Sequence, residues 1–234
     1  MSRDRTFTKS LCALREIDRY SLSILCGTTF PMVEIIYQDE ALLAINKPTR
    51  LLTVPGKGPD KQDCLYRRVL DAFPDALVVH RLDMDTSGLI LFARSAEAQR
   101  NLSMQFEKRE IEKSYVAVVE GVMEKKVGMV DFPMRKDMDQ RLPPKHLVDC
   151  VRGKKAVTEW KVLEGNENTT RVALYPKTGR SHQLRVHMES IGHPIVGDPI
   201  YGHSAERLML HAQSLDLRHP GAGEPLRLKC PAPF

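Results

Sequence analysis

The sequence predicts an α+β fold in which a mostly antiparallel mixed sheet is flanked by helices. Strand-like segments outnumber helical ones, and several neighbouring strands are joined by short turns, which favours antiparallel pairing. The chain has 234 residues, of which 42% are hydrophobic and 28% are charged, and this composition is typical of a globular protein with a full core. We therefore expect one domain that combines helices and strands.

The first strands are expected to form a hairpin at the start of this domain. Residues 1–31 are mixed in character and are expected to be an N-terminal extension, so that the domain covers residues 32–234. Strands are expected at residues 33–37 and 41–45, with a tight turn between them. Pro48 ends the second strand, because proline has no N–H to donate to a sheet.

Three helices are expected, each with apolar side chains that repeat every three or four residues. Asp63 is expected to cap the first helix and Ser95 the second, because both side chains can accept hydrogen bonds from free backbone N–H groups. The third helix is expected from Ser181 to Gly192. Trp160 lies in an alternating segment and is expected in the core. Further strands are expected at residues 115–120, 157–163, 171–175, 208–211 and 214–217.

The charge distribution favours a polyanionic partner. The whole chain has a formal charge of +5. Residues 121–155 alone hold nine Lys or Arg against five Asp or Glu, so most of the surplus lies in this segment. A basic surface attracts polyanions such as nucleic acid through long-range electrostatics.

Cysteine spacing and hydropathy exclude several other classes of protein. The five cysteines are scattered and form no Cys-x-x-Cys pair, which argues against a disulfide framework and against a zinc knuckle. No apolar run is long enough for a signal peptide or a transmembrane helix. We therefore expect a cytoplasmic protein without a membrane partner.

The stretch His80–Gly88, with the sequence HRLDMDTSG, is the first candidate for chemistry. It puts Asp83 two residues after Arg81 in a charged segment with apolar residues on both sides. A charged loop between two buried strands is fixed by the scaffold and still accessible, which suits a catalytic residue. On composition alone, an ordinary polar hairpin is the alternative.

The start of the third helix is a second candidate, in this case for binding phosphate. Residues 177–181 form a basic turn at the point where free backbone N–H groups of a helix can receive an anion. A solvated helix face capped by Ser181 is the alternative interpretation.

A bound metal is not expected. Asp83 and Asp85 could hold a divalent cation, as paired carboxylates do in some transferases. However, His182, His187 and His193 are separated by steps of five and six residues, which do not bring histidines to one helix face. The sequence also has no Cys/His cluster.

Three long motifs resemble those of the RluA-type pseudouridine synthases: HRLDMDTSG, KSYVAVVEG at residues 113–121, and KTGRSHQLRVHMESIGHPIVGDPIYG at residues 177–202. NKP at residues 46–48 and LMLHA at residues 208–212 also fit, and the match runs from about Val33 to the C-terminus. The resemblance implies the pseudouridine synthase fold with a central catalytic cleft. It also implies isomerisation of uridine in structured RNA to its C-glycoside, without a cofactor or a metal.

The resemblance also implies a role for individual residues. Asp83 is the implied catalytic carboxylate, which attacks the ribose or the uracil ring or abstracts a ribose proton. Arg185 is its implied ion-pair partner, with Arg180 as the alternative. Tyr115 is the implied active-site tyrosine that packs on the base, and Arg81 fills the gap left when the target uridine flips out of its stack. RNA contacts are expected at Arg81, His80, Arg180, His182, Lys154 and Lys155.

The substrate expectation comes from the same resemblance. The chain resembles compact members that lack a separate small RNA-binding domain, and among these the member that modifies both large-subunit ribosomal RNA and the anticodon stem-loop of certain tRNAs. We therefore expect a monomeric enzyme that acts on stem-loops of ribosomal RNA and of tRNA anticodon arms, with no DNA partner. Three alternatives stay open: the same chemistry on only one of these RNAs, a non-catalytic RNA-binding or folding-assistance protein on the same scaffold, and a metal-dependent glycosyl or phosphoryl transferase that uses Asp83 and Asp85.

Overall fold

The structure is a computed structural model, and it describes residues 33–139 and 144–234. The expected extension at residues 1–31 lies outside the described residues. None of the helices in the described part of the chain is long and apolar enough to cross a membrane. The helices are α1 (Leu65–Ala72), α2 (Ala96–Lys108) and α3 (Gln183–Ser190), with a 3-10 turn η1 (Pro59–Lys61). The strands are β1 (Glu34–Gln38), β2 (Leu42–Lys47), β3 (Leu77–Val78), β4 (Ser87–Ala93), β5 (Glu112–Glu120), β6 (Val127–Val130), β7 (Met134–Lys136), β8 (His146–Val148), β9 (Thr158–Gly165), β10 (Thr169–Pro176), β11 (Leu210–Arg218) and β12 (Pro225–Lys229).

One large sheet organises the molecule. It has ten strands, which follow the order β1-β2-β4-β11-β5-β10-β9-β6, with β3 also paired to β4 and β12 to β11. Among the described strands, β4 and β11 form a parallel pair, whereas the other named pairs are antiparallel. Strands β7 and β8 form a separate two-stranded sheet. The prediction of a mostly antiparallel mixed sheet with flanking helices is therefore confirmed.

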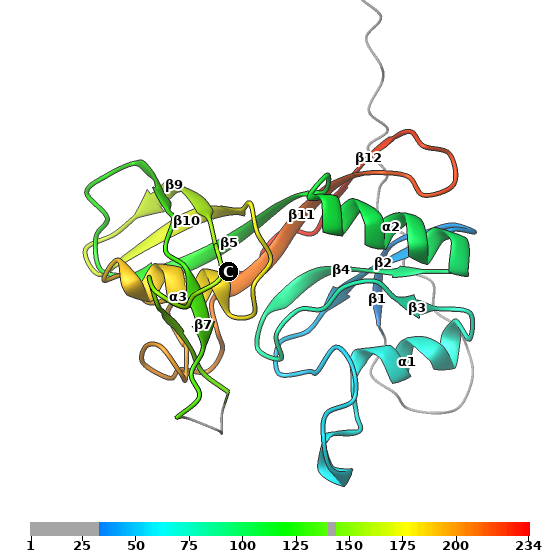
Figure 1. Ribbon diagram of the computed structural model, residues 1–234, viewed down its shortest axis with the longest axis horizontal. Coiled ribbons are helices and arrows are strands. Elements are labelled where there is room, and N and C mark those ends of the chain that lie inside the picture. Colours follow the sequence, from blue (N-terminus) through cyan, green and yellow to red (C-terminus); the bar gives the residue numbers. More distant parts are fainter. Residues whose placement is uncertain (1–32, 140–143) are drawn as a thin grey trace, which may run out of the picture.

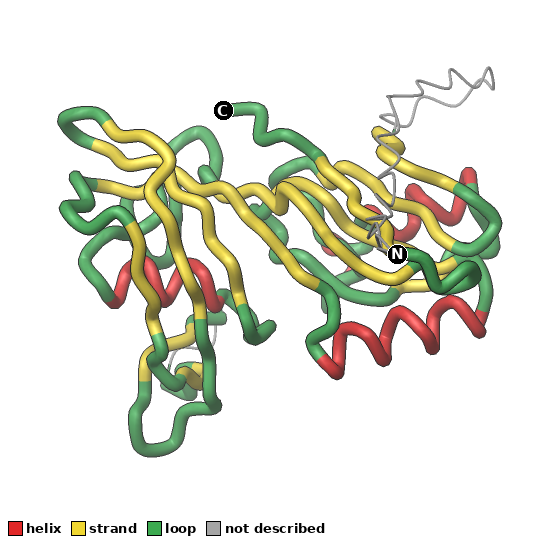
Figure 2. The backbone as a smooth tube through the Cα atoms, turned by 90° about the horizontal axis from the view of Figure 1, so that it is seen from above, coloured by secondary structure: helices red, strands yellow, loops and turns green. Residues whose placement is uncertain are grey.

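The large sheet runs through two halves of the molecule, with α1 and α2 in one half and α3 in the other (Figures 1 and 2). Strand β4 is buried along its whole length because two helices cover its opposite faces. Leu65 of α1 packs in one apolar cluster with Ile90, whereas Leu102 of α2 packs in another with Leu89. Met188 of α3 belongs to a third cluster in the other half. The two halves therefore have separate cores on one continuous sheet.

The predicted helix caps have different outcomes. Ser95 caps α2 as predicted, because its side chain accepts a hydrogen bond from the Ala98 N–H at 3.1 Å. The prediction that Asp63 caps the first helix is wrong. Cys64 stands at the cap position without a side-chain bond, since the Asp63 carboxylate instead receives two hydrogen bonds from Arg68 at 2.9 and 2.6 Å.

Helix α3 begins at Gln183 rather than at Ser181. His182 has a left-handed backbone with φ of 57°, so the chain completes a turn before it becomes helical. The alternative of a solvated helix face is wrong, because this helix is buried on nearly every side. Trp160 is buried as predicted. The buried residues of α3 are Gln183, Leu184, Arg185, Val186, His187 and Met188.

The junction between β4 and β11 fixes the point at which β4 begins. Gly88 pairs with Ala212 and has φ of 108°, and a Cβ atom there would lie 2.3 Å from the Ala212 carbonyl oxygen. Only glycine fits this approach. The Oγ atom of Ser87 lies 2.9 Å from His211 Nδ1 and accepts a hydrogen bond from Arg207 Nη2 at 2.7 Å. Side chains from a distant segment of the chain therefore hold the start of β4.

Candidate active site

The loop between β3 and β4 carries Asp83, and a buried lysine holds the backbone of this loop. Lys47 is completely buried at the end of β2. Its Nζ atom donates to three carbonyl oxygens, those of Pro48 at 2.9 Å, Leu51 at 2.7 Å and Met84 at 2.9 Å. Burial lowers the pKa of Lys47 to about 8, and the nearby carboxylates act in the opposite direction. The ammonium group thus anchors the residue that directly follows Asp83.

Two threonines fix the same loop on either side of Asp83. Thr53 Oγ1 donates to the Leu82 carbonyl at 2.8 Å. Thr49 Oγ1 donates to the Asp85 carbonyl at 2.7 Å. The backbone before and after Asp83 is therefore held, whereas its side chain remains 30% exposed. A fixed backbone with an accessible carboxylate is the arrangement that a catalytic side chain needs.

The structure brings Arg185 of α3 to Asp83. The Nε and Nη2 atoms of Arg185 each donate to the Asp198 carboxylate at 2.7 Å, and Nη1 lies 3.9 Å from Asp83 Oδ2. Arg185 is 2% exposed and Asp198 is fully buried. Two short bonds therefore go to the buried carboxylate, and the third nitrogen faces the accessible one.

Asp198 is a site residue that the sequence reasoning missed. Burial opposes its ionisation, but the hydrogen bonds from Arg185 hold its pKa below the usual range. Its Oδ1 atom also accepts the backbone N–H groups of Ile200 at 2.9 Å and Tyr201 at 3.1 Å. The signal that could have found it is its place in the motif at residues 177–202, which also contains Arg185, because a buried acid requires a cationic partner.

Tyr115 lies on β5 between the two halves. Its backbone pairs with Ala212 on one side and with Leu174 on the other, and its side chain packs against an apolar cluster in each half. Burial raises the pKa of Tyr115 far above its ordinary value, and the charge of Asp83 adds to the effect. The phenol therefore stays protonated near neutral pH, within electrostatic reach of Asp83.

A cluster of two histidines and a tyrosine lies beside Asp83. His182 Nδ1 is 2.9 Å from the Tyr201 hydroxyl, which also accepts the backbone N–H of His146 at 2.8 Å. The ring centroids of His146 and His182 are 5.1 Å apart. Burial lowers the pKa of both histidines, although the charge of Asp83 acts against it. His146 and Tyr201 were not predicted: His146 lies in no pattern that points to a site, and Tyr201 lies inside the motif at residues 177–202 but was given no role there.

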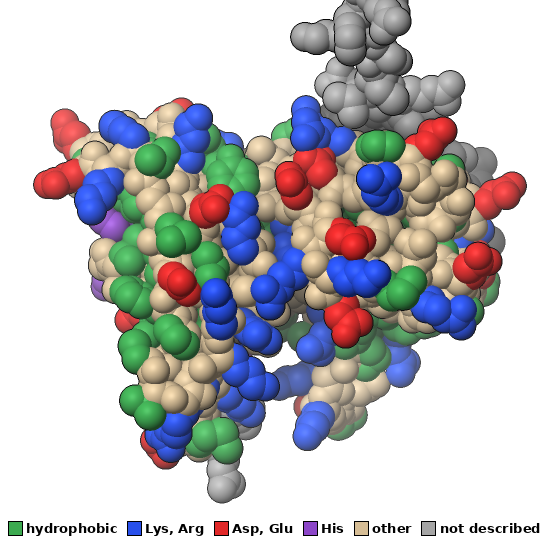
Figure 3. Space-filling model, turned by 45° about the horizontal axis from the view of Figure 1, so that its top comes forward, with side chains coloured by type: hydrophobic (Ala, Val, Ile, Leu, Met, Phe, Trp, Pro, Cys, Tyr) green, Lys and Arg blue, Asp and Glu red, His purple; other side chains and the backbone are tan. Residues whose placement is uncertain are grey.

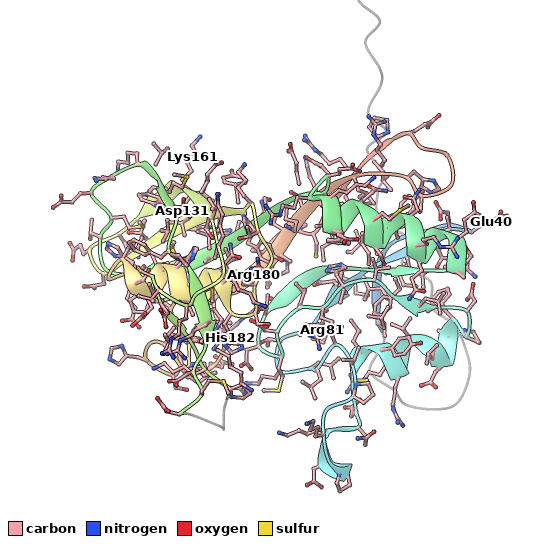
Figure 4. The ribbon with its side chains drawn as sticks, viewed as in Figure 1. Glu40, Arg81, Asp131, Lys161, Arg180 and His182 are labelled. Atoms are coloured by element: carbon pink, nitrogen blue, oxygen red, sulfur yellow. The ribbon has the colours of Figure 1, made fainter. Side chains whose placement is uncertain are left out.

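The predicted RNA contacts Arg81, Arg180, Lys154 and Lys155 are all exposed. Figure 4 shows Arg81 on the loop of one half, with Arg180 and His182 on the other half across the same junction. Arg180 Nε donates to the Lys155 carbonyl at 3.2 Å, which ties these two segments together. Figure 3 shows a hollow between the halves, where Lys and Arg side chains gather. The arrangement suits a polyanion that enters between the halves.

His80 is not brought to this group. Its Nε2 atom accepts the backbone N–H of Leu91 at 2.9 Å, and its ring packs against Phe106 with centroids 4.5 Å apart. Burial lowers the pKa of His80 to about 3. The structure thus uses this neutral ring to support the strand that leaves the loop.

The three histidines considered for a metal have separate partners. His182 binds Tyr201, whereas His187 Nδ1 lies 2.9 Å from Thr158 Oγ1. His193 follows α3 in the chain, and its Nδ1 atom lies 2.8 Å from the carbonyl oxygen of Glu120 at the end of β5. Each ring is therefore engaged with a different part of the sheet or its loops.

Residues 41–190, more than half of the chain, match the family model for RNA pseudouridylate synthase. The chain belongs to this family, and the resemblance predicted from its motifs is confirmed. It is an RNA pseudouridine synthase, an enzyme that acts on RNA. The comparisons do not favour the alternative of a non-catalytic RNA-binding protein.

Curated relatives match this chain over almost their full length. The chain is 46% identical over 206 residues to the dual-specificity RNA pseudouridine synthase RluA of Yersinia pestis, which covers 86% of this chain and 99% of the relative. It is 45% identical over 210 residues to the dual-specificity RNA pseudouridine synthase RluA of Escherichia coli strain K12, with 87% and 95% covered. The member that the motifs most resemble is therefore also a close match, over 86–87% of this chain.

Solved structures show the same fold. The human RNA pseudouridylate synthase domain containing 1 is 28% identical, with a TM-score of 0.75, and the match covers 90% of this chain and 87% of that one. The human RNA pseudouridylate synthase domain containing 4 is 27% identical, with a TM-score of 0.68 and coverage of 85% and 88%. The predicted pseudouridine synthase fold is therefore confirmed.

Proposed function

We propose that this enzyme isomerises uridines in stem-loops of both large-subunit ribosomal RNA and tRNA anticodon arms. The support is its identity of 45–46% with relatives whose names state dual specificity, over at least 95% of their length. RNA proteins recognise such stem-loops by shape and by bases that can be splayed out. We further propose that residues 32–234 act as one catalytic domain, as a monomer in the cytoplasm and without a DNA partner.

The contact between Asp83 and Arg185 carries the proposed chemistry. Asp83 is the proposed catalytic carboxylate, which attacks the ribose or the uracil ring or abstracts a ribose proton. At 3.9 Å, Arg185 Nη1 stabilises the negative charge and leaves the oxygen outside hydrogen-bond range. Asp198 supports this geometry, because it holds the guanidinium by two other nitrogens. The carboxylate of Asp83 thus lies beside a fixed cation and is accessible.

The isomerisation then needs one bond broken and one bond formed. The bond between N1 of uracil and C1′ of ribose breaks, the uracil turns, and C5 joins C1′. The proton on C5 leaves and N1 gains a proton, so that the product is an isomer. Tyr115 is the proposed platform for the uracil ring. Its phenol is protonated and lies near Asp83, so it assists removal of the C5 proton by passing its own proton to the Asp83 carboxylate as it accepts the one from C5.

Entry of the uridine requires it to leave its stack, which costs a few kcal/mol. We assign Arg81 to fill the vacated gap, because it is exposed two residues before Asp83. Lys154, Lys155 and Arg180 are the proposed phosphate contacts, since phosphate contacts position the RNA and base contacts specify it. We assign to His182 a contact with the part of the RNA that lies beside Asp83.

The test is tritium release from C5 of labelled uridine in two transcripts, a large-subunit ribosomal stem-loop and a tRNA anticodon arm. We expect the wild-type chain to release tritium from both RNAs and Asp83→Ala to release none. Asp85→Ala removes a neighbouring carboxylate and serves as the control that keeps activity. Release from only one RNA contradicts the dual specificity, and unchanged release by Asp83→Ala contradicts the role of Asp83.

A further inference from the structure

Tyr201 is a buried residue whose hydroxyl joins two separate elements. The residue is 9% exposed. Its oxygen accepts the backbone N–H of His146 at 2.8 Å, at the start of β8. The same hydroxyl lies 2.9 Å from Nδ1 of His182, which stands immediately before α3. One hydroxyl therefore connects the two-stranded β7–β8 sheet with the entry to the helix that carries Arg185.

Chemistry fixes the direction of the first of these two hydrogen bonds and limits the second to two possibilities. The backbone N–H of His146 can only donate, so it uses a lone pair of the Tyr201 oxygen. The phenolic proton is then free to be donated to His182 Nδ1, and of the two directions that this pair allows, this is the one that we infer. In the neutral imidazole, the proton of His182 consequently lies on Nε2. That Nε2 atom has no hydrogen-bond partner among the residues that the structure describes.

The ring of Tyr201 belongs to the same assembly. The guanidinium carbon of Arg185 lies 5.2 Å from the ring centroid, and Lys145 Nζ lies 5.7 Å from it. Cations at this distance from an aromatic face are attracted by the ring. Asp198 fixes the backbone N–H of Tyr201 and also clamps Arg185. The ring and the hydroxyl are thus held by the groups that orient the catalytic pair.

The charged groups around His182 agree with a neutral ring. Burial lowers its pKa, and Arg185 and His146 act in the same direction, whereas Asp83 and Asp198 oppose them. A neutral imidazole with its proton on Nε2 offers one N–H donor beside the catalytic carboxylate. Such a donor suits an oxygen acceptor of the flipped nucleotide, which can be a uracil carbonyl, a ribose oxygen or a phosphate oxygen.

We propose that Tyr201 is a positioning residue for pseudouridine formation, which holds His182 in the tautomer that donates from Nε2 to the flipped nucleotide. This inference rests on the proposed function, since it assumes that the nucleotide reaches Asp83. Tyr201 acts through His182 and does not itself touch the substrate. Because the relay begins at the backbone of His146, it also ties the donor to the β7–β8 sheet.

The first test is Tyr201→Phe, which removes the hydroxyl and keeps the ring and its contacts with Arg185. We expect kcat for tritium release to fall about tenfold, with KM changed less than about twofold, because one positioning hydrogen bond is lost. Tyr175→Phe is the matched control, since its side chain is exposed on β10. An unchanged kcat in Tyr201→Phe, or an equal change in the control, overturns the proposal.

The second test does not depend on activity. In ¹⁵N-histidine NMR of the wild-type chain, the His182 resonances are expected to report a single neutral tautomer protonated at Nε2. In Tyr201→Phe they are expected to report a mixture of tautomers. A single Nε2-protonated form in both chains overturns the relay, even if the enzyme is active. If the wild-type chain shows the relay but releases no tritium, the proposed function fails and the tautomer assignment stands.

A third variant, His182→Asn, tests the proposal even if the Tyr201→Phe chain does not fold. His182→Asn puts an amide oxygen near the position of Nδ1 and removes the donor at Nε2, and asparagine tolerates the left-handed backbone at this position. We expect its kcat to fall as far as that of Tyr201→Phe. A His182→Asn chain with wild-type kcat overturns the proposal.

Discussion

Arg185 and Asp83 face each other without a short hydrogen bond, since Nη1 of the arginine lies 3.9 Å from Oδ2 of the aspartate. The remaining nitrogens of the guanidinium are engaged by Asp198 at 2.7 Å. The carboxylate of Asp198 thus orients the guanidinium of Arg185, and the positive charge of that guanidinium acts on the carboxylate of Asp83. This division separates the residue that binds Arg185 from the residue that reacts.

The two hydrogen bonds between Asp198 and Arg185 predict that Asp198→Asn lowers both the stability and the activity of the enzyme. Breaking a buried ion pair leaves an uncompensated charge and costs about 3–5 kcal/mol. We therefore expect a corresponding fall in the free energy of unfolding, measured with urea, and a loss of tritium release in the protein that remains folded. Asp216→Asn is the control, because Asp216 pairs with Arg227 on the exposed surface. Equal effects of the two variants would contradict a special role for Asp198.

The β4–β11 junction predicts that Gly88→Ala is strongly destabilising. The φ of 108° and the 2.3 Å approach to the Ala212 carbonyl both oppose a Cβ atom. Backbone strain alone costs about 1–3 kcal/mol, and the clash adds to it. Gly223→Ala is the matched control, because its φ is 72° and no atom lies within 4 Å of a Cβ there. A urea unfolding curve for each variant separates the clash from the strain, and equal losses would rule out the clash.

His211 predicts a pH-dependent part of the stability. Burial lowers its pKa to about 4 in the folded state, against about 6.5 in the unfolded chain. Between these values the unfolded chain binds more protons, so this contribution is complete above pH 6.5 and is lost as the pH falls toward 4. It amounts to about 3 kcal/mol. Urea unfolding at several pH values from 4 to 7 should give a free energy of unfolding that depends less steeply on pH for His211→Gln than for wild type. The same pH dependence in both chains would contradict this contribution of His211.

Lys154 and Lys155 predict the salt dependence of RNA binding. Each phosphate contact contributes about 0.7–0.9 to the slope of log K against log salt. We expect the double variant Lys154→Ala, Lys155→Ala to bind a stem-loop more weakly, with a slope smaller by about 1.5. Lys161→Ala is the control, since Lys161 lies on the outer side of its half, away from the junction (Figure 4). A filter-binding titration that gives the wild-type slope for the double variant would remove these residues from the interface.

Arg81 predicts a separation of turnover from affinity. If its side chain fills the gap left by the flipped uridine, Arg81→Ala should lower kcat at least tenfold and weaken equilibrium binding by less than about threefold. Single-turnover tritium release and a binding titration on the same stem-loop measure the two quantities. Equal losses in both would show that Arg81 is only another phosphate contact.

The residues of the catalytic loop could be predicted from the sequence because their motif is contiguous. Asp83 and Arg81 stand in one nine-residue segment, and the apolar residues on both sides correctly indicated strands. The pairing of Arg185 with Asp83 was expected from the family motif. Sequence patterns of this kind record local spacing, which survives into the structure wherever the backbone is continuous.

The support of the site could not be predicted in the same way. The bond between His146 and Tyr201 joins residues 55 positions apart, and His146 lies in a strand of three residues with no distinctive pattern. The Asp63 cap failed because Arg68 competes for the carboxylate. The alternative of a solvated face for α3 failed because Arg185 is buried, where Asp198 neutralises it. These outcomes depend on tertiary partners, which local periodicity does not contain.

The parallel pairing of β4 with β11 also determines at which stage of translation the sheet can be completed. Ser87 and His211 are 124 residues apart in the chain. Contacts of such separation are closed slowly and form only after the intervening chain has been made. A growing polypeptide can therefore already form the contacts of Thr49 and Thr53 with the loop of Asp83, but the contact of β4 with β11 forms only after β11 has been translated. A chain that stops before β11 therefore lacks the strand that pairs with both β4 and β5, and with it the link between the loop of Asp83 and the strand of Tyr115.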